Sequence, residues 1–261
     1  MRPAALITGG GSGIGAATAH LLARDGWLVG VMGRRAAPLE AVATATGGLA
    51  IPGDATSADD LAAAVAVIVA AGGGLTGLVC SAGSGSPGTA LEQTPAGWNT
   101  VLATNLTAPF LAARAALPHL LDSRGAIVVV ASLAGLRAGA GSVAYSAAKA
   151  GAIHLSRCLA VDHGPAGVRT NVVCPGWVQT PMADAALSEL AAHHGGSLAA
   201  AYAEATRFAP DRRPSTADEV GETIAWLLSS RASGINGATI TVDGGAHIVD
   251  AEGIAFLPPT P

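Results

Sequence analysis

The sequence is poor in several residue types, and each shortage excludes a class of protein. Its three cysteines, Cys80, Cys158 and Cys174, lie far apart without a C-x-x-C pair, so they predict neither a disulfide framework nor a zinc site. The longest apolar run, Leu61 to Ala71, is much shorter than the about 20 residues that a membrane-spanning helix needs. The first apolar stretch ends in glycines by Gly9, which does not match a secretory signal peptide. We therefore expect a cytoplasmic protein without a membrane span.

Charge of either sign is also scarce. Charged residues make up 12% of the chain and the net charge is −4, so no surface for nucleic acid or an anionic membrane is predicted. The seven histidines include no H-E-x-x-H motif, and His193 and His194 would point about 100° apart on a helix, so no metal site is expected. Half of the 261 residues are apolar, which is enough for a large hydrophobic core.

Lysine and tyrosine are so rare that one pairing of them is informative. Thirteen of the 14 basic residues are Arg and the single Lys is Lys149, while the two tyrosines are Tyr145 and Tyr202. Because Tyr145 precedes Lys149 by four residues, both lie on one face of a helix. A nearby ammonium lowers the pKa of a phenol, which is about 10 when unperturbed. Read alone, the pair is more often an exposed lysine beside a half-buried tyrosine; together with the motifs described below it predicts an acid/base site.

Short apolar runs alternate with longer helical patterns along almost the whole chain. The candidate strands read as continuous hydrophobic runs, which is typical of a parallel sheet covered on both faces; they are Ala4–Thr8, Trp27–Met32, Leu49–Pro52, Gly77–Ser81, Ala126–Ala131, Val168–Val173 and Ala238–Val242. The candidate helices are Gly13–Asp25, Ala36–Thr46, Ser57–Ala71, Pro95–Leu121, Val143–His163 and Thr216–Ser229.

This alternation predicts one α/β domain over residues 1–261. We expect a Rossmann-type doubly wound parallel sheet of about seven strands, with helices on both faces. The segment 181–214 is predicted as an irregular substrate-loop insertion at the carboxyl ends of the strands, where ligands bind in such folds. Residues 246–261 are predicted to form a C-terminal tail.

A glycine-rich loop joins the first strand to the first helix. It reads Thr8-Gly9-Gly10-Gly11-Ser12-Gly13-Ile14-Gly15. Glycines allow a tight turn and a close approach of the backbone to a pyrophosphate, and the N-terminus of the next helix then faces the anion. The loop therefore predicts dinucleotide binding rather than a merely flexible turn.

From Thr8 to Gly245 the sequence resembles the classical short-chain dehydrogenase/reductase family. The motifs that carry the resemblance are the glycine-rich loop, Asp54, Ala82-Gly83, Asn105, Ser132, Tyr145 with Lys149, Pro175-Gly176 with Thr180, and Val242-Asp243-Gly244-Gly245. One departure is Ser81, which stands where the family has an Asn that supports the strand beside the cofactor. The resemblance implies hydride transfer between NAD(P)(H) and a secondary alcohol or ketone.

The resemblance also implies the roles of four residues. Ser132 would orient the substrate, Tyr145 would be the acid/base, and Lys149 would contact the Tyr and the ribose hydroxyls. Asn105 would hold a water in a proton relay behind Lys149. Without the resemblance, Ser132 is a capping or turn serine at a strand end, and Asn105 is a core polar residue or the site of a helix kink. The chain has no G-x-S-x-G elbow, so a hydrolase nucleophile is not predicted.

The end of the second strand bears on the choice of cofactor. NAD-selective proteins usually carry an acid there, which accepts hydrogen bonds from the ribose, whereas this chain has Gly33-Arg34-Arg35. Two guanidiniums suit a 2′-phosphate, so NADP(H) is favoured, with NAD(H) as the alternative. The predicted cofactor-binding residues are Thr8, Gly9, Gly11, Ser12, Gly13, Ile14, Gly15, Gly33, Arg34, Arg35, Asp54, Ala82, Gly83, Tyr145, Lys149, Pro175, Gly176 and Thr180.

The sequence favours a ketone reductase or alcohol dehydrogenase with an apolar, small-to-medium substrate. The predicted pocket walls are Leu133, Leu136, Trp177 and Met182. A 3-oxoacyl-carrier-protein reductase is the alternative enzyme, with Arg124, Arg137 and Arg169 as candidates for docking the acidic carrier. A nucleotide-sensing regulator without catalysis is the alternative of another class, and a sugar-nucleotide epimerase would need a longer C-terminal domain.

The apolar end of the chain indicates self-association. The tail contains Ile248, Val249, Ile254, Phe256 and Leu257, which would favour aggregation if exposed on a monomer. A homo-oligomer, most often a tetramer in the resembled family, would bury them, although the tail can also fold back on its own domain.

Overall fold

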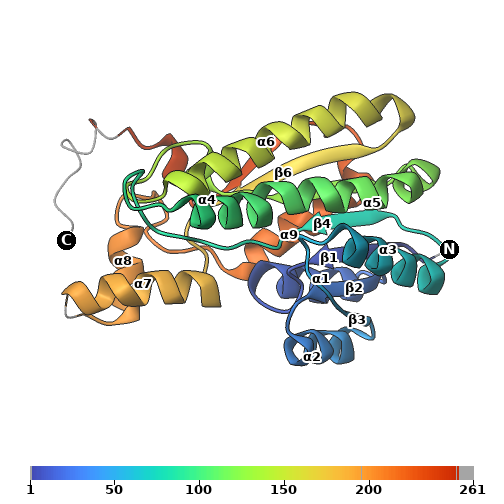
Figure 1. Ribbon diagram of the computed structural model, residues 1–261, viewed down its shortest axis with the longest axis horizontal. Coiled ribbons are helices and arrows are strands. Elements are labelled where there is room, and N and C mark those ends of the chain that lie inside the picture. The colour runs from blue at the N-terminus through green and yellow to red at the C-terminus, as the bar shows by residue number, and fades with distance from the viewer. Residues whose placement is uncertain (1, 195, 251, 253–261) are drawn as a thin grey trace.

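The computed structural model describes residues 2–194, 196–250 and 252, and its centre is one parallel β-sheet (Figure 1). In these residues the sheet has seven strands in the order β3-β2-β1-β4-β5-β6-β7, and each neighbouring pair is parallel. The strands are β1 Ala4–Thr8, β2 Leu28–Gly33, β3 Leu49–Pro52, β4 Gly77–Cys80, β5 Ala126–Val130, β6 Arg169–Pro175 and β7 Thr239–Val242. This confirms the predicted doubly wound sheet, with boundaries shifted by at most two residues.

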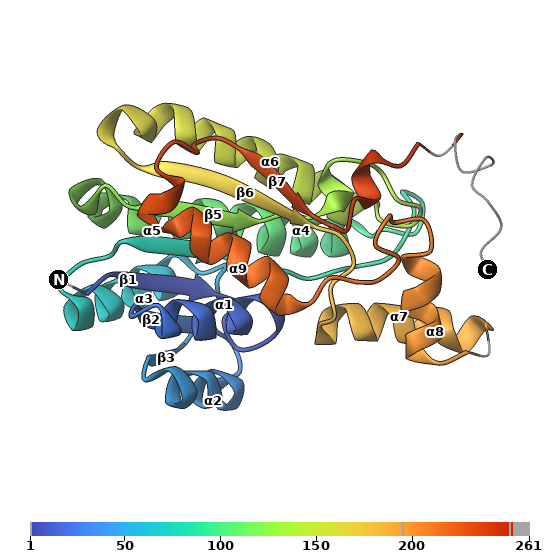
Figure 2. The ribbon, with the colours of Figure 1, turned by 180° about the vertical axis from the view of Figure 1, so that it is seen from behind.

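Helices cover both faces of the sheet (Figures 1 and 2). Helices α3 Ala58–Gly72, α5 Ala108–Ser123 and α6 Val143–His163 pack on one face, where Leu6, Leu78 and Ile127 join their cluster. Helices α1 Gly13–Arg24, α2 Ala36–Thr46 and α9 Ala217–Leu228 pack on the other, against Ile7 and Val79. Consecutive strand residues thus face opposite layers and both are buried, which explains the unbroken hydrophobic runs.

The strand order reverses beside β1, and this reversal positions the ligand site. β1 pairs with β2 on one side and with β4 on the other, and Thr8 aligns with Met32 and Cys80. The connections after β1 and β4 leave in opposite directions, so a crevice opens at the carboxyl ends of these strands. The glycine-rich loop lies there.

Two sequence expectations need correction. The expected helix Pro95–Leu121 is divided into α4 Pro95–Leu102, a π-helical turn Ala103–Thr107 and α5. The turn contains the buried Asn105, whose side-chain amide donates to the Val101 carbonyl at 3.0 Å and to the Ser84 carbonyl outside the helix. A side chain thus enters the series of backbone hydrogen bonds of the helix, which is a common cause of a π-helical turn.

The segment 181–214 is more regular than expected. It contains α7 Pro181–His194 and α8 Leu198–Ala205, which pack on each other beyond the carboxyl ends of the strands (Figures 1 and 2). The N-cap Ser197 accepts from the backbone N–H of Ala200, and Tyr202 donates to Asp184 at 2.8 Å. Alanine-rich composition favours helix, which the sequence-based interpretation as a loop underestimated.

No helix in the described residues is long and apolar enough to cross a bilayer. Of the expected C-terminal tail, residues 251 and 253–261, including Ile254, Phe256 and Leu257, lie outside the described residues, as do the side chains of His193 and His194.

Candidate active site

The glycine-rich loop has close backbone contacts that explain its composition. Gly9 has φ +68°, and a Cβ there would lie 2.7 Å from the backbone nitrogen of Ala82. A Cβ at Gly15 would lie 2.4 Å from the carbonyl oxygen of Gly9, far inside contact distance. Thr8 ties the loop to β4, since its hydroxyl accepts from the Ala82 N–H at 3.3 Å. The loop and the segment after β4 are thus packed together without side chains between them.

The first turn of α1 leaves its amide groups open to a ligand. Ser12 is the N-cap, but among the described residues its side chain makes no cap hydrogen bond. A helix N-terminus with uncapped N–H groups favours an anion such as a pyrophosphate. A Cβ at Gly13 would lie 3.1 Å from Cγ2 of Thr180, so the segment after β6 closes the other side of the loop. The arrangement fits a dinucleotide.

The segments that follow β2 and β3 carry cationic and acidic groups at the carboxyl ends of the strands. Arg34 and Arg35 are exposed, and Arg35 precedes α2 as its N-cap residue. The half-buried Asp54 accepts hydrogen bonds from the backbone N–H and hydroxyl of Thr56 at 2.9 and 2.8 Å. These bonds, with a smaller contribution from Arg34, lower the pKa of Asp54. The guanidinium of Arg34 therefore lies near a stable carboxylate and remains accessible to solvent.

Three side chains predicted to act together are brought together. Ser132 follows β5, and Tyr145 and Lys149 lie one turn apart on α6. Ser132 Oγ accepts from the Ala134 N–H at 3.1 Å, and the Ser132 hydroxyl lies close enough to the Tyr145 phenol to act on its pKa. Lys149 is only 4% exposed; its Nζ donates to the carbonyl of Val130 at 2.8 Å and lies 5.6 Å from the centre of the Tyr145 ring.

Burial dominates the electrostatics of this group. Burial lowers the pKa of Lys149 to about 8, and weaker interactions with Cys174 and Cys80 oppose it. Burial likewise raises the pKa of Tyr145, while the Ser132 hydroxyl acts in the opposite direction. In the protein without ligands the pKa of Tyr145 is therefore raised and not lowered, because desolvation of the phenolate is the largest cause, and the lowering expected beside Lys149 and a cationic nicotinamide stays a prediction.

Asn105 holds the loop that follows β4. Its Nδ2 donates to the Ser84 carbonyl at 2.8 Å, and its Oδ1 accepts from the Ser84 N–H at 3.4 Å. The Asn105 amide thereby bonds both backbone groups of Ser84, as a neighbouring strand would, and fixes Gly83 beside Lys149. A Cβ at Gly83 would lie 3.2 Å from Asn105 Oδ1 and 3.7 Å from Lys149 Nζ. In this structure the Asn105 side chain holds the backbone of Ser84 through two hydrogen bonds.

The predicted pocket walls lie at the same end of the sheet. Met182, on the first turn of α7, is close enough to contact a Cβ at Gly83 (3.9 Å to its Cε) and is half exposed. Leu136 and Trp177 are 43% and 40% exposed, and Leu133 is half-buried. Of these apolar side chains, Met182 approaches the segment after β4 that also borders Lys149.

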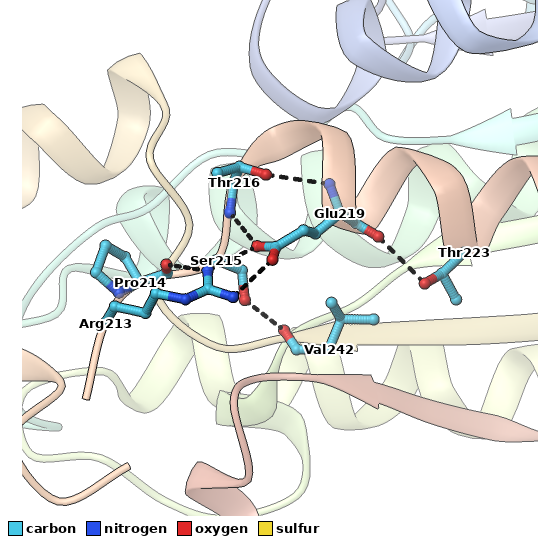
Figure 3. Close-up of polar contacts among 7 residues, drawn as sticks. All are labelled: Arg213, Pro214, Ser215, Thr216, Glu219, Thr223 and Val242. Carbon is cyan, nitrogen blue, oxygen red and sulfur yellow. Dashed lines mark hydrogen bonds and ion pairs between the residues drawn. The ribbon is translucent and has the colours of Figure 1, made fainter. Parts of the chain in front are cut away.

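The segment returning from α8 is anchored at the start of α9 (Figure 3). The guanidinium of Arg213 donates to both carboxylate oxygens of Glu219 at 2.7 and 3.0 Å. Thr216 and Glu219 form a capping box, and the Ser215 hydroxyl donates to the carbonyl of Val242 at 3.5 Å. These bonds lower the pKa of Glu219 to about 2, with the Arg213 hydrogen bond as the largest cause. The segment 181–214 is thus fixed at its C-terminal end.

Sequence reasoning missed three contributors to the site. Cys174 is fully buried near the end of β6, and its thiol lies near the Ser132 backbone and the Lys149 ammonium, both of which act on its pKa. The buried carboxylate of Asp243 packs beneath Gly176, where a Cβ would lie 2.9 Å from its Cβ. Ser84 is the partner of Asn105. No local pattern marks Cys174 or Ser84, because their partners are distant in sequence, and the Val242-Asp243-Gly244-Gly245 motif did not show that Asp243 packs against Gly176.

Known proteins support the same assignment. A family model described as Enoyl-(Acyl carrier protein) reductase matches residues 9–247. The chain is 41% identical to Protein MoaE of Klebsiella aerogenes, over 96% of this chain and 98% of that protein. It is 38% identical to 2-(S)-hydroxypropyl-CoM dehydrogenase 3 of Xanthobacter autotrophicus, over 92% and 94%.

The solved structures agree with the sequence relatives. An actinorhodin polyketide ketoreductase variant with NADPH superposes with a TM-score of 0.90 at 29% identity, covering 95% of this chain and 98% of that chain. Named relatives of this kind are dehydrogenases and reductases of hydroxy and keto compounds. The chain therefore belongs to the short-chain dehydrogenase/reductase family and is an NAD(P)(H)-dependent oxidoreductase that interconverts secondary alcohols and ketones.

Proposed function

We propose that the protein is an NADP(H)-dependent ketone reductase in which Ser132, Tyr145, Lys149 and Asn105 serve the reaction. The observation that supports this most directly is the buried Lys149, whose Nζ lies 5.6 Å from the centre of the Tyr145 ring and is fixed by the Val130 carbonyl, at the sheet edge that carries Ser132 and the glycine-rich loop. The nicotinamide supplies or accepts the hydride when it is bound. The chain's own residues orient the carbonyl and move the proton.

The protein groups divide this work. The Ser132 hydroxyl donates to the substrate oxygen and keeps it within reach of the phenol. Tyr145 gives its proton to that oxygen during reduction and takes it back during oxidation. Lys149, with Val130 as its only hydrogen-bond acceptor among the described residues, has two N–H groups left for ribose hydroxyls. In oxidation, the positive charge of the oxidised nicotinamide offsets the cost of burying the phenolate.

Substitution of Tyr145 tests this assignment. Tyr145→Phe removes one oxygen and leaves the ring packing, so turnover is expected to fall by at least about 100-fold while cofactor affinity survives. Tyr202→Phe is the matched control, because Tyr202 bonds Asp184 in the α7–α8 unit. Turnover of the Tyr145→Phe protein above about a tenth of wild type would contradict the role.

The preference for NADP(H) is proposed from the exposed Arg34 and Arg35 and the absence of an acid from Val29 to Pro38. Arg34→Asp is expected to lower kcat/KM for NADPH by at least about tenfold, since a phosphate loses a charged donor and meets a carboxylate. Arg114→Asp makes the same charge change on the exposed side of α5 and serves as the control. An NADH preference of the unmodified protein would contradict the proposal.

We propose an apolar substrate of small or medium size, from the exposed apolar groups Leu136, Trp177 and Met182. Carrier-protein substrates have less support. Of the three candidate docking arginines, only the exposed Arg137 follows β5 at the carboxyl ends of the strands. Arg124 caps the C-terminus of α5, and Arg169 begins β6 and donates to the Ser229 carbonyl, so both lie at the amino ends. Comparing free ketones with acyl thioesters tests the choice, and a preference for thioesters would reverse it.

A homotetramer in the cytoplasm completes the proposal. Phe110 on α5 and Val161 on α6 are exposed apolar side chains, 45% and 75% accessible, which association would cover. Light scattering at micromolar concentration tests the assembly, and a monomeric mass would exclude it. The three cysteines are free, which suits a reducing compartment.

A further inference from the structure

One methionine in the part of the chain that the structure describes has an accessible side chain, and it borders the site. The chain has three methionines. Met32 on β2 is fully buried and Met1 lies outside the described residues, whereas Met182 on the first turn of α7 is 50% exposed. Oxidation of a methionine to its sulfoxide requires that the oxidant reach the sulfur. Met182 is therefore the described methionine that a soluble oxidant can attack.

The same side chain packs beside the catalytic lysine. The methyl carbon Cε of Met182 lies 3.9 Å from the position that a Cβ of Gly83 would occupy, and Nζ of Lys149 borders that position at 3.7 Å. Because Cε is bonded to the sulfur, the sulfur is one bond away from this contact. Met182 thus joins an exposed thioether to an apolar contact at the segment after β4.

The residues around Met182 bridge the crevice. Two residues earlier, Cγ2 of Thr180 lies 3.1 Å from the position of a Cβ at Gly13, in the glycine-rich loop. Thr180 therefore approaches the loop after β1, and Met182 approaches the segment after the neighbouring strand β4. A dinucleotide held in this crevice passes the segment 180–182, so the polarity of the Met182 side chain bears on its binding.

The other sulfur atoms beside the site are protected from oxidation. Cys80 and Cys174 are buried, and burial raises the pKa of their thiols to about 12 and about 11. Since oxidants attack the thiolate, both cysteines stay reduced at physiological pH. The exposed cysteine, Cys158, lies near the C-terminal end of α6. It is the competing target for an oxidant, away from Met182.

We propose that Met182 is a redox-sensitive modification site, at which hydrogen peroxide converts the thioether to a sulfoxide and thereby weakens binding of the dinucleotide. The sulfur gives an electron pair to one peroxide oxygen, the O–O bond breaks, and the second oxygen leaves as water. A methionine sulfoxide reductase reverses the change, because two thiols remove the oxygen as water and become a disulfide.

The new oxygen acts against cofactor binding in two ways. A sulfoxide oxygen is a strong hydrogen-bond acceptor, so packing it against Gly83 costs its hydration. The donor that borders the same position is the Lys149 ammonium, and a bond to it would compete with the ribose hydroxyls of the cofactor. The inference rests on the proposed function only in assigning the crevice to a dinucleotide, since the oxidation itself does not depend on turnover.

Calorimetric titration with NADPH before and after peroxide treatment measures the effect without turnover. Peptide mass spectrometry is expected to find an added oxygen at Met182 and none at the buried Met32. The Kd for NADPH is expected to rise at least about tenfold, and to return to its first value after treatment with methionine sulfoxide reductase and a dithiol. Cys158→Ser removes the exposed thiol and is the matched control, which should show the same rise.

Two substitutions separate the sulfur from the polarity that oxidation adds. Met182→Leu has no sulfur, so its Kd for NADPH, whatever its starting value, should not change on peroxide treatment. Met182→Gln carries a polar amide in place of the thioether, and without any oxidant it should bind NADPH at least about fivefold more weakly than Met182→Leu.

Three results would each overturn the proposal. They are an oxidised Met182 with a Kd within about twofold of its first value, a response of Met182→Leu to peroxide like that of wild type, and equal NADPH affinities of Met182→Gln and Met182→Leu. Failure of the proposed function is distinguishable. It would appear as retained turnover in Tyr145→Phe or as a preference for NADH, and the same titration with NADH would still report on Met182.

Discussion

Because Lys149, the only lysine, is buried, its titration contributes to the pH dependence of the unfolding free energy, and a substitution of Lys149 measures that contribution. Burial lowers the pKa of Lys149 from 10.5 to about 8. Below pH 8 the lysine is charged in both the folded and the unfolded chain, and folding must desolvate that charge. Above about pH 10.5 it is neutral in both, and the penalty is gone. Lys149 therefore destabilises the folded state at neutral pH, and its penalty decreases as pH rises from about 8 to 10.5.

The expected magnitude follows from the two pKa values. A difference of about 2.5 pH units corresponds to about 3 kcal/mol of unfolding free energy at 1.36 kcal/mol per unit. Lys149→Met keeps an unbranched apolar chain but cannot titrate. The unfolding free energy of wild type minus that of Lys149→Met is thus expected to increase by up to about 3 kcal/mol between pH 7 and pH 10.5.

Urea unfolding of both proteins, without cofactor and with a reductant present, measures this difference. Arg114→Met, a change at an exposed cation, controls for general charge effects and should show a constant difference over the same range. A wild-type minus Lys149→Met difference that stays within about 0.5 kcal/mol from pH 7 to pH 10.5 would refute the argument that burial controls this lysine.

Three further predictions follow from packing and hydrogen bonds. Gly15→Ala places a Cβ 2.4 Å from the Gly9 carbonyl oxygen, so the affinity for NADPH, measured by calorimetry, should fall at least about tenfold. Gly11→Ala places its Cβ 3.3 Å from Pro38 Cβ and should change the affinity less than about threefold. Asn105→Ala leaves the Ser84 N–H and carbonyl unpaired and should lower the unfolding free energy, measured in urea, by about 1–3 kcal/mol. An unchanged unfolding free energy would exclude a structural role for these two hydrogen bonds. The pKa of Glu219 is lowered to about 2, so its contribution to the unfolding free energy is complete above about pH 4.3 and is lost as pH falls through 2. The difference in unfolding free energy between wild type and Glu219→Gln, measured in acid titrations, should therefore disappear over that interval. A constant difference would show that the Arg213 ion pair contributes nothing.

Much of the fold was predictable because its signals are local. A run such as Ala126–Ala131 is apolar on both alternating sets, and only a strand covered on both faces needs that, so β5 was found to within one residue. The four-residue spacing of Tyr145 and Lys149 places both on one helix face whatever surrounds them. The glycine-rich loop predicted a tight turn with close approach of the backbone, and Gly9 and Gly15 do lie close to neighbouring backbone atoms.

Other features depend on which distant segments meet, and only the tertiary structure decides that. The sequence could not show that Lys149 is buried beneath β5, so it predicted a lowered pKa for Tyr145, whereas burial raises it. The alanine-rich composition of α7 was a helix signal that the sequence-based interpretation underestimated, but the packing of α7 on α8 and the Tyr202–Asp184 hydrogen bond appear only in the tertiary structure. The contact of Ser84 with Asn105 joins residues 21 apart across a strand–helix connection, and no periodicity encodes it. Local pattern determines the elements of this protein, but desolvation and long-range hydrogen bonding determine the chemistry of its site, because both depend on neighbours that folding alone brings together.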